Sequence, residues 1–177
     1  LIMMDGAAIY DIHENVFLSA ETIPPEGSAR IRAALDAQQV SYFIYTIHHN
    51  KTCIFHQGDV SAADEAVYQQ MKRSPYRSYL EGESFEDDEI VYLKIIDETD
   101  RVQELERRLR NYMDGRKLRM SIKPEHSLPG VSGLYFYADS ATMPQAEERL
   151  MRMLREKDPA LRPREVFLRA PYRSEHD

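Results

Sequence analysis

Six histidines are the first candidates for chemistry, and His48, His49 and His56 lie close together in the sequence. A zinc ion would need three or four such side chains within bonding distance of one point. Residues 40–56 are rich in aromatic and β-branched side chains on both sides of the pair His49-Asn50, which predicts a β-hairpin. In that hairpin His48 and His56 would stand about 15 Å apart along the strands. The spacing therefore predicts surface or structural histidines and no metal site.

The sequence lacks the patterns of the common nucleophiles and phosphate loops. No serine lies in a Gly-x-Ser-x-Gly elbow, and no glycine-rich loop has either usual phosphate-binding form. Cys53 lies within a predicted strand, away from any helix start that would activate its thiol. The acidic run 81–89 lacks the alternating Asp/Asn spacing of a calcium loop. We expect a small core residue at Cys53 and a solvated loop at 81–89.

Asp5 follows an apolar segment, and many phosphotransfer enzymes place their nucleophile at the end of a strand. That chemistry also needs a second acid two residues away, which acts as acid/base and helps to hold magnesium. Met3 and Ala7 occupy those positions. Because Gly6 tolerates positive φ, Asp5-Gly6 between two apolar runs predicts a hairpin turn. No catalytic residue is predicted.

Composition limits the classes of protein and partner. The chain has 177 residues, 42% hydrophobic and 30% charged, which is the balance of a globular domain. Its net charge of −7 argues against nucleic acid as a partner, and the basic residues between 107 and 119 alternate with acids, as on a solvated helix face. No apolar stretch reaches the roughly 20 residues of a membrane helix. A single cysteine and no signal segment predict a cytoplasmic location.

Hydrophobic periodicity predicts an α+β fold. Helical stripes cover residues 25–38, 62–73, 97–113 and 145–157, and shorter β-rich segments lie between them, joined by hairpin-like links. This order favours a mainly antiparallel sheet with helices on one face. Residues 74–88 mix proline, glycine, acids and aromatics, which is typical of a long functional loop. The chain begins without methionine, inside a predicted strand, which suggests a piece of a longer polypeptide.

Several segments, in order, resemble one known family. The motif Met4-Asp5-Gly6-Ala7 is similar to a hairpin that usually reads Asn-Gly-Ala, and Ile23-Pro24-Pro25-Glu26 leads a helix in the expected place. The strands at 41–46, ending in Tyr-Thr, and at 90–97 follow in the same order. Together they resemble the cap domain of the Cof-like hydrolases of the haloacid dehalogenase (HAD) superfamily. The resemblance covers residues 1–138, and residues 139–177 would form a helix and a strand that re-enter a missing Rossmann-like core.

The resemblance implies a magnesium-dependent small-molecule phosphatase in which this chain is the substrate-specificity cap. A separate HAD catalytic core would supply the nucleophilic aspartate and hold Mg2+, and the partner would be a small phosphorylated metabolite. Met143 stands where the family has a phosphate-binding lysine, and Ala170-Pro171 where it has a Gly-Asp pair. We therefore transfer no catalytic or metal residue to this chain, and predict that it is inactive alone and binds no cofactor by itself.

The family pattern places substrate contacts on the cap loops. These would be Tyr45, His48, His49 and Lys51 at the hairpin end, and Tyr76 and Arg77 on the long loop. Arginine and lysine suit a phosphate, and aromatic side chains suit a sugar or a ring. The alternative is a non-catalytic binding or regulatory module, stand-alone or degenerate, that uses the open face of its sheet. The aromatic residues Tyr42, Phe43 and Tyr45 suit either hypothesis.

Overall fold

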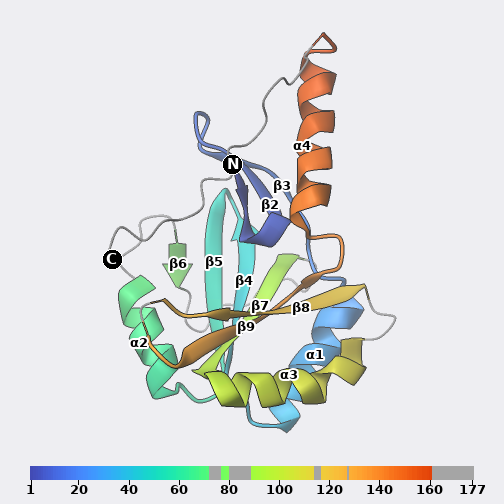
Figure 1. The fold of residues 1–177 in the computed structure, drawn as a ribbon. Coiled ribbons are helices and arrows are strands. Elements are labelled where there is room, and N and C mark those ends of the chain that lie inside the picture. Colours follow the sequence, from blue (N-terminus) through green and yellow to red (C-terminus); the bar gives the residue numbers. More distant parts are fainter. Residues whose placement is uncertain (72–76, 80–88, 114–116, 127, 161–177) are drawn as a thin grey trace.

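The computed structural model describes residues 1–71, 77–79, 89–113, 117–126 and 128–160 (Figure 1). A small antiparallel sheet opens the chain, with strands β1 (Ile2–Met3), β2 (Ala8–Asp11) and β3 (Val16–Ala20) in that order. A short 3-10 turn, η1 (Met4–Gly6), joins β1 to β2, so Asp5-Gly6 is the predicted hairpin turn.

A large sheet forms the body of the molecule, with the order β6-β5-β4-β7-β9-β8. Its neighbouring strands are antiparallel except for β6, which runs parallel to β5. The central strands are almost entirely buried, as their aromatic and β-branched composition predicts. The strands are β4 (Tyr42–His48), β5 (Lys51–Gln57), β6 (Arg77–Tyr79), β7 (Ile90–Glu98), β8 (Leu118–Pro124) and β9 (Val131–Ala138).

The helices follow the predicted stripes closely. They are α1 (Pro25–Ala37), α2 (Ala62–Met71), α3 (Thr99–Met113) and α4 (Met143–Lys157). Proline in the first turn begins α1, and α4 begins where the Thr142 hydroxyl accepts a hydrogen bond from the Gln145 amide. In the part of the chain that the structure describes, no helix is long and apolar enough to cross a membrane. The strand expected after this last helix, within residues 139–177, lies outside the described residues, which end at 160.

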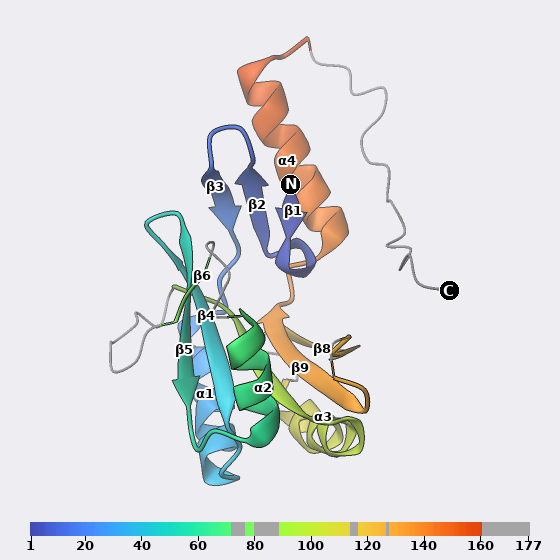
Figure 2. The same cartoon turned by 90° about the vertical axis from the view of Figure 1, so that its left-hand side faces the viewer.

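The main core lies between the large sheet and the helices α1 and α3. Leu35 of α1 and Leu109 of α3 are fully buried against Ile44 and Leu93 of the central strands. The predicted α+β class with a mainly antiparallel sheet is confirmed, and these two helices share one face as expected. The helix α2 lies on the opposite face, where Val67 packs in a second buried cluster with Tyr45 (Figure 2).

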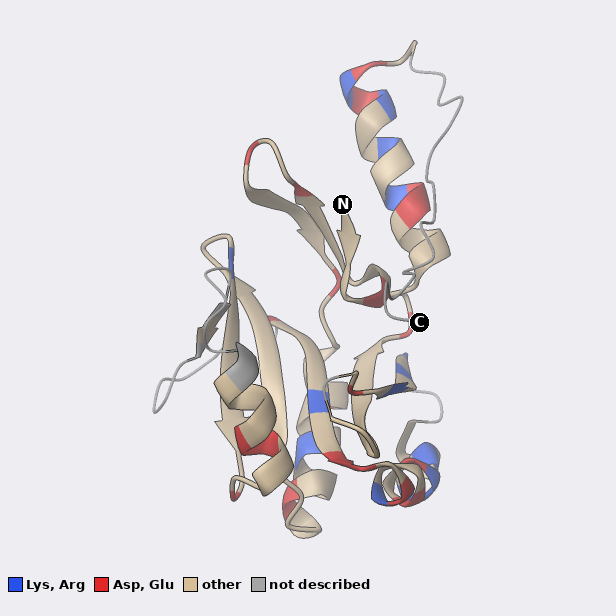
Figure 3. Cartoon of the chain, turned by 60° about the vertical axis from the view of Figure 1, so that its left-hand side comes forward, with Lys and Arg blue, Asp and Glu red and all other residues tan. Residues whose placement is uncertain are grey.

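The exposed side of α3 carries charges of both signs (Figure 3). Arg107 and Arg108 pair with Glu104, and Arg110 pairs with Glu106, all one helical turn apart. Each such pair contributes little free energy because it lies in water. The part of the basic run that lies on α3 is therefore the solvated helix face that the sequence predicts, whereas Arg119 lies on β8.

The helix α4 packs on η1 and the small sheet, and we call these elements together the small unit. Two short segments, residues 21–24 and 139–142, connect it to the large sheet (Figure 2). The predicted division at residue 138 coincides with the end of β9, but β1, η1 and β2 from the start of the chain pack with α4 beyond that point. The division into domains 1–138 and 139–177 stays a prediction.

Candidate functional site

Strand register brings tyrosines and an arginine into one row across the large sheet. Tyr45 on β4 pairs with Tyr92 on β7, and Tyr92 pairs with Tyr137 on β9. Tyr137 in turn pairs with Arg119 on β8. The rings of Tyr45 and Tyr92 are stacked with centroids 4.1 Å apart, and the guanidinium of Arg119 lies 4.5 Å from the centre of the Tyr137 ring. Directly paired residues point to the same side, so the row lies on the face opposite α1 and α3.

A buried ion pair forms the next row on this face. Lys94 on β7 pairs with Tyr135 on β9, and its ammonium lies 2.6 Å from the carboxylate of Glu125, just after β8. The phenol of Tyr135 donates a hydrogen bond to the same carboxylate oxygen at 3.2 Å. A Cβ on Gly133 would lie 2.8 Å from that oxygen, so glycine leaves the space that the pair fills. The carboxylate is therefore held by two donors in a fixed position.

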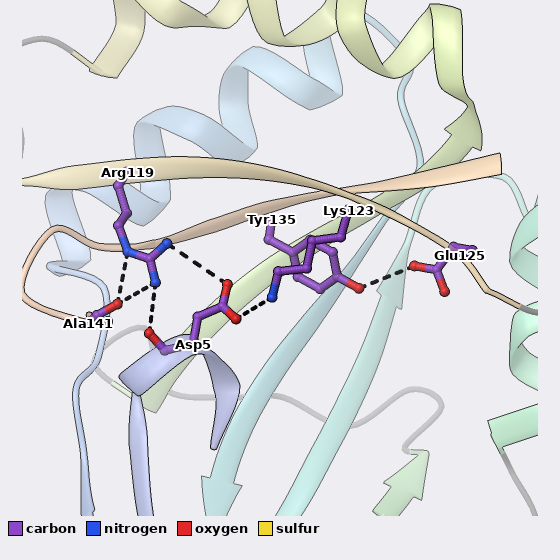
Figure 4. A network of polar contacts seen from close by, with 6 residues as sticks. All are labelled: Asp5, Arg119, Lys123, Glu125, Tyr135 and Ala141. Atoms are coloured by element: carbon purple, nitrogen blue, oxygen red, sulfur yellow. Dashed lines mark hydrogen bonds and ion pairs between the residues drawn. The ribbon is translucent and has the colours of Figure 1, made fainter. Parts of the chain in front are cut away.

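Asp5 reaches this face from the small unit (Figure 4). Its carboxylate forms an ion pair with Lys123 of β8, and its other oxygen lies 4.0 Å from Arg119. Lys123 in turn lies 5.0 Å from the centre of the Tyr135 ring. In Figure 3 this acidic turn lies beside the basic segments of β8. We call Asp5, Arg119, Lys123, Glu125 and Tyr135 the polar cluster.

The turn that carries Asp5 has an unusual backbone. Met4, Asp5 and Gly6 all have positive φ, at 52°, 55° and 94°. A side chain at Gly6 would collide with the backbone of Thr142, because its Cβ would lie 2.3 Å from the carbonyl carbon. Such strained positions persist only where the surroundings fix them. The turn therefore packs closely against the start of α4, and the side chain of Asp5 points toward β8.

Two arginines hold the junction between the small unit and the large sheet. Arg119 donates to the carbonyl of Ala141 at 2.9 Å and to that of Asp5 at 3.1 Å. Arg149 of α4 donates to the carbonyl of Gly6 at 2.6 Å and lies 3.3 Å from the carboxylate of Glu21. These contacts tie both connecting segments to the turn at Asp5. The polar cluster therefore lies at a fixed joint between two sheets.

The tyrosines of this face are held in their neutral form. Burial raises the pKa of Tyr135, and the negative charge of Glu125 raises it further. Burial also raises the pKa of Tyr137, as does the charge of Asp5, whereas Arg119 lowers it. At physiological pH both phenols therefore keep their protons, and Tyr135 donates its proton in the hydrogen bond to Glu125.

The residues predicted to bind substrate do not gather at one point. Tyr45 is buried in the tyrosine row. His48, His49 and Lys51 lie at the exposed tip of the β4–β5 hairpin, where His48 lies 3.2 Å from Glu89. His48 pairs with Lys51 across the predicted turn His49-Asn50. Arg77 begins β6, and Tyr76 lies outside the described residues. Binding of substrate by these six residues stays a prediction.

Most of the polar cluster is not apparent from the sequence. Arg119 falls in the basic run that predicts a solvated surface, Asp5 falls in a predicted turn, and no prediction covers Lys123. The available signal was alternation with a period of two, since Arg119, Ser121 and Lys123 must share one face of a strand. Only the fold shows which strands lie beside β8 and that Asp5 lies against it.

The described donor groups do not fit a magnesium site. Asp5, the carboxylate at the strand end, faces two cations rather than further carboxylates. Among the described residues, no group of three or more His, Cys, Asp or Glu side chains is arranged to hold a metal ion. Magnesium chemistry therefore enters no step assigned to this chain.

Comparison with solved structures identifies the fold. A haloacid dehalogenase-like hydrolase from B. subtilis matches with a TM-score of 0.56 and 17% identity, over 86% of this chain and 57% of its own. A haloacid dehalogenase-like hydrolase from Bacteroides thetaiotaomicron matches with a TM-score of 0.59 and 12% identity. The match covers 85% of this chain and 52% of the hydrolase. The HAD subclass IIB sugar phosphatase BT4131 matches with a TM-score of 0.51 and 12% identity. The match covers 86% of this chain and 52% of the phosphatase.

The chain shares its fold with part of the haloacid dehalogenase-like hydrolases. The predicted resemblance is confirmed at this level. The chain spans about half the length of these structures. No protein-family model and no curated protein matches the sequence.

Proposed function

We propose that this chain is the substrate-selecting cap of a phosphate-ester hydrolase of the HAD type. The observation that carries the proposal is the polar cluster, because it combines cations, neutral phenol donors and aromatic rings on one face of the large sheet. Cations suit the phosphate of a small metabolite, and phenols and ring faces suit a sugar or another ring. The shared fold with hydrolases, one of them a sugar phosphatase, supports the same class of ligand.

In this proposal the chain selects and shields the substrate, and another part of the protein breaks the bond. A cap contributes by excluding water and by positioning the substrate over the reacting group. Arg119 and Lys123 would contact the anionic part, and Tyr135 would contact the remainder. The nucleophilic aspartate and Mg2+ would belong to a HAD catalytic core. The hairpin tip with His48, His49 and Lys51 is proposed as a second contact region.

A non-catalytic binding module is the second candidate function. Met143 is the first residue of α4, where the resemblance implies a phosphate-binding lysine. A protein without that cation would retain the binding face and lose turnover. Both candidates predict the same ligand class for this face, so a hydrolysis assay separates them only in the protein that includes a core.

Calorimetric titration with a panel of sugar phosphates, the unphosphorylated sugars and inorganic phosphate tests the proposal. We expect at least one sugar phosphate to bind about tenfold tighter than its sugar and than inorganic phosphate, a difference of about 1.4 kcal/mol. Lys123→Gln should weaken this binding, and Lys157→Gln, which removes an exposed charge at the far end of α4, should not. Equal affinity for all three ligand types would reject the cap assignment.

The same 177-residue chain should not release phosphate from p-nitrophenyl phosphate or sugar phosphates above background with magnesium present. Asp5→Asn should leave that background unchanged, because Asp5 lacks an acidic partner and faces two cations. Magnesium-dependent turnover that disappears in Asp5→Asn would instead make Asp5 a nucleophile and would contradict the proposal.

A further inference from the structure

We propose that Arg119 and Lys123 form an anion-binding site that the carboxylate of Asp5 occupies in this structure, and that the phosphate of a ligand takes its place. Asp5 would thus act as an internal competitor that sets the threshold for ligand binding. The identity of the ligand as a phosphate monoester rests on the proposed function, whereas the competition by Asp5 does not.

The two cations are positioned to receive an anion. Each lies over a tyrosine ring, Arg119 over Tyr137 at 4.5 Å and Lys123 over Tyr135 at 5.0 Å. The ring faces carry partial negative charge and hold the cations in place without neutralising them. The side chain of Arg119 is 25% exposed and that of Lys123 is 38% exposed, so a ligand from solvent can reach both.

The backbone orients Arg119 without using all of its donors. Its Nε and Nη2 groups donate to the carbonyls of Ala141 and Asp5. Its Nη1 group lies 4.0 Å from the Asp5 carboxylate, which is beyond hydrogen-bond length. The guanidinium is therefore fixed in direction, while its contact with the Asp5 side chain is loose. A phosphate oxygen closer to Nη1 would make a shorter, charge-assisted bond.

The charges also favour replacement of Asp5 by phosphate. Glu125 pairs with Lys94 in the neighbouring row, so the charge that faces Arg119 and Lys123 in the described contacts is the single one of Asp5. Two cations thus face one carboxylate. A phosphate monoester carries a charge of about −1.5 to −2 near neutral pH, which matches the two cations better. The Asp5 side chain is 29% exposed, so water partly screens its ion pairs and can hydrate the carboxylate when a ligand displaces it.

Asp5 can leave without loss of the turn that carries it. Its φ is 55°, a conformation that aspartate and asparagine adopt more readily than most residues. The turn itself is held by Arg149, which donates to the carbonyl of Gly6, and by the contact of Gly6 with Thr142. The substitution Asp5→Asn therefore removes the charge and retains the backbone.

Titration with inorganic phosphate at low ionic strength tests the competition directly. We expect Asp5→Asn to bind phosphate about threefold to fivefold tighter than the unchanged chain, the range for loss of one half-exposed ion pair. Glu14→Gln makes the same change in net charge at an exposed position of the β2–β3 turn and should change the affinity less than twofold. Adding Lys123→Gln to Asp5→Asn should reverse the gain.

The outcomes separate the two proposals. If Asp5→Asn binds phosphate no better than Glu14→Gln does, Asp5 does not compete with ligand and the inference is overturned, even if sugar phosphates still bind better than sugars. If Asp5→Asn binds phosphate more tightly while sugar phosphates bind no better than inorganic phosphate, the competition stands and the substrate-selecting cap fails. If the tighter phosphate binding of Asp5→Asn is retained when Lys123→Gln is added, the anion binds elsewhere and the inference is also overturned.

Discussion

The ammonium group of Lys94 lies 2.6 Å from the carboxylate of Glu125, and both side chains are almost fully buried. The pair connects the central strand β7 with the segment after β8 on the face that carries the polar cluster. A buried charge without its partner is costly, whereas a buried pair contributes little net free energy. This relationship gives the first test of the site's architecture.

Glu125→Ala should lower the free energy of unfolding by about 3 to 5 kcal/mol, because it removes the carboxylate that lies 2.6 Å from the buried ammonium of Lys94. Urea unfolding followed by circular dichroism measures the change. The double variant Lys94→Met with Glu125→Leu should recover most of the loss, since it removes both charges. If the single variant is as stable as the unchanged chain, Lys94 is not buried in the way described.

Gly6→Ala should be more destabilising than Gly130→Ala. Both glycines have positive φ, at 94° and 78°, so alanine strains the backbone at either position. Only at Gly6 would the added Cβ meet the Thr142 backbone, at 2.3 Å, whereas nothing lies within 4 Å of a Cβ on Gly130. We expect Gly130→Ala to cost about 1 kcal/mol and Gly6→Ala at least about 1 kcal/mol more, in thermal unfolding. Equal costs would contradict the close approach of η1 to α4.

Asp64 should make the free energy of unfolding depend on pH in the acid range. Burial alone would raise its pKa, but His56, Ser41 and Ser61 favour the charged form and hold the pKa below its ordinary value. The Ser41 hydroxyl donates to the carboxylate at 2.6 Å and the Ser61 amide at 3.0 Å. A lowered folded-state pKa contributes stability that is present above the unfolded value of about 3.9 and is lost as the pH falls through the folded value.

Asp64→Asn should therefore cost about 1 to 3 kcal/mol at neutral pH, and its deficit should shrink as the pH falls below about 4. Chemical unfolding at a series of pH values measures both effects. Asp59→Asn, at an exposed position in the loop before α2, is the matched control and should change the free energy of unfolding at neutral pH by less than about 0.5 kcal/mol. A deficit of constant size at every pH would mean that Asp64 contributes no proton linkage.

Leu109→Ala should cost about 2 to 5 kcal/mol, because this side chain is fully buried between α3 and the large sheet. Tyr112→Ala, on the same helix, removes a side chain that is 45% exposed and should cost much less. Denaturant midpoints of the two variants provide the comparison. A change below about 1 kcal/mol at Leu109 would mean that the face of α3 assigned to the core is wrong.

Local sequence patterns were sufficient to predict the elements themselves. The helical stripe at 97–113 predicts α3 with its apolar residues on one face, and Leu105 and Leu109 of that face are buried. The turn pair His49-Asn50 predicts the β4–β5 hairpin. In the structure both residues adopt the positive φ that a tight turn requires. These features depend on neighbours within a few residues, which is why one sequence reveals them.

The polar cluster depends on contacts that one sequence does not specify. Asp5 and Lys123 are 118 residues apart. The row from Tyr45 to Arg119 requires the order β4-β7-β9-β8, in which neighbours in space are not always neighbours in sequence. The position of α2 on the face opposite α1 was missed for the same reason. Alternation within 119–123 indicates a shared face but not what lies against it.

The central claim is that the polar cluster binds the ligand, and nuclear magnetic resonance mapping of the bound site tests it most directly. The 177-residue chain is titrated with the sugar phosphate that binds best, and backbone and side-chain shifts are followed. We expect saturable shifts that concentrate at Asp5, Arg119, Lys123 and Tyr135, and that are lost in Lys123→Gln. Shifts confined to the hairpin tip at His48, His49 and Lys51, with the polar cluster unchanged, would contradict this claim.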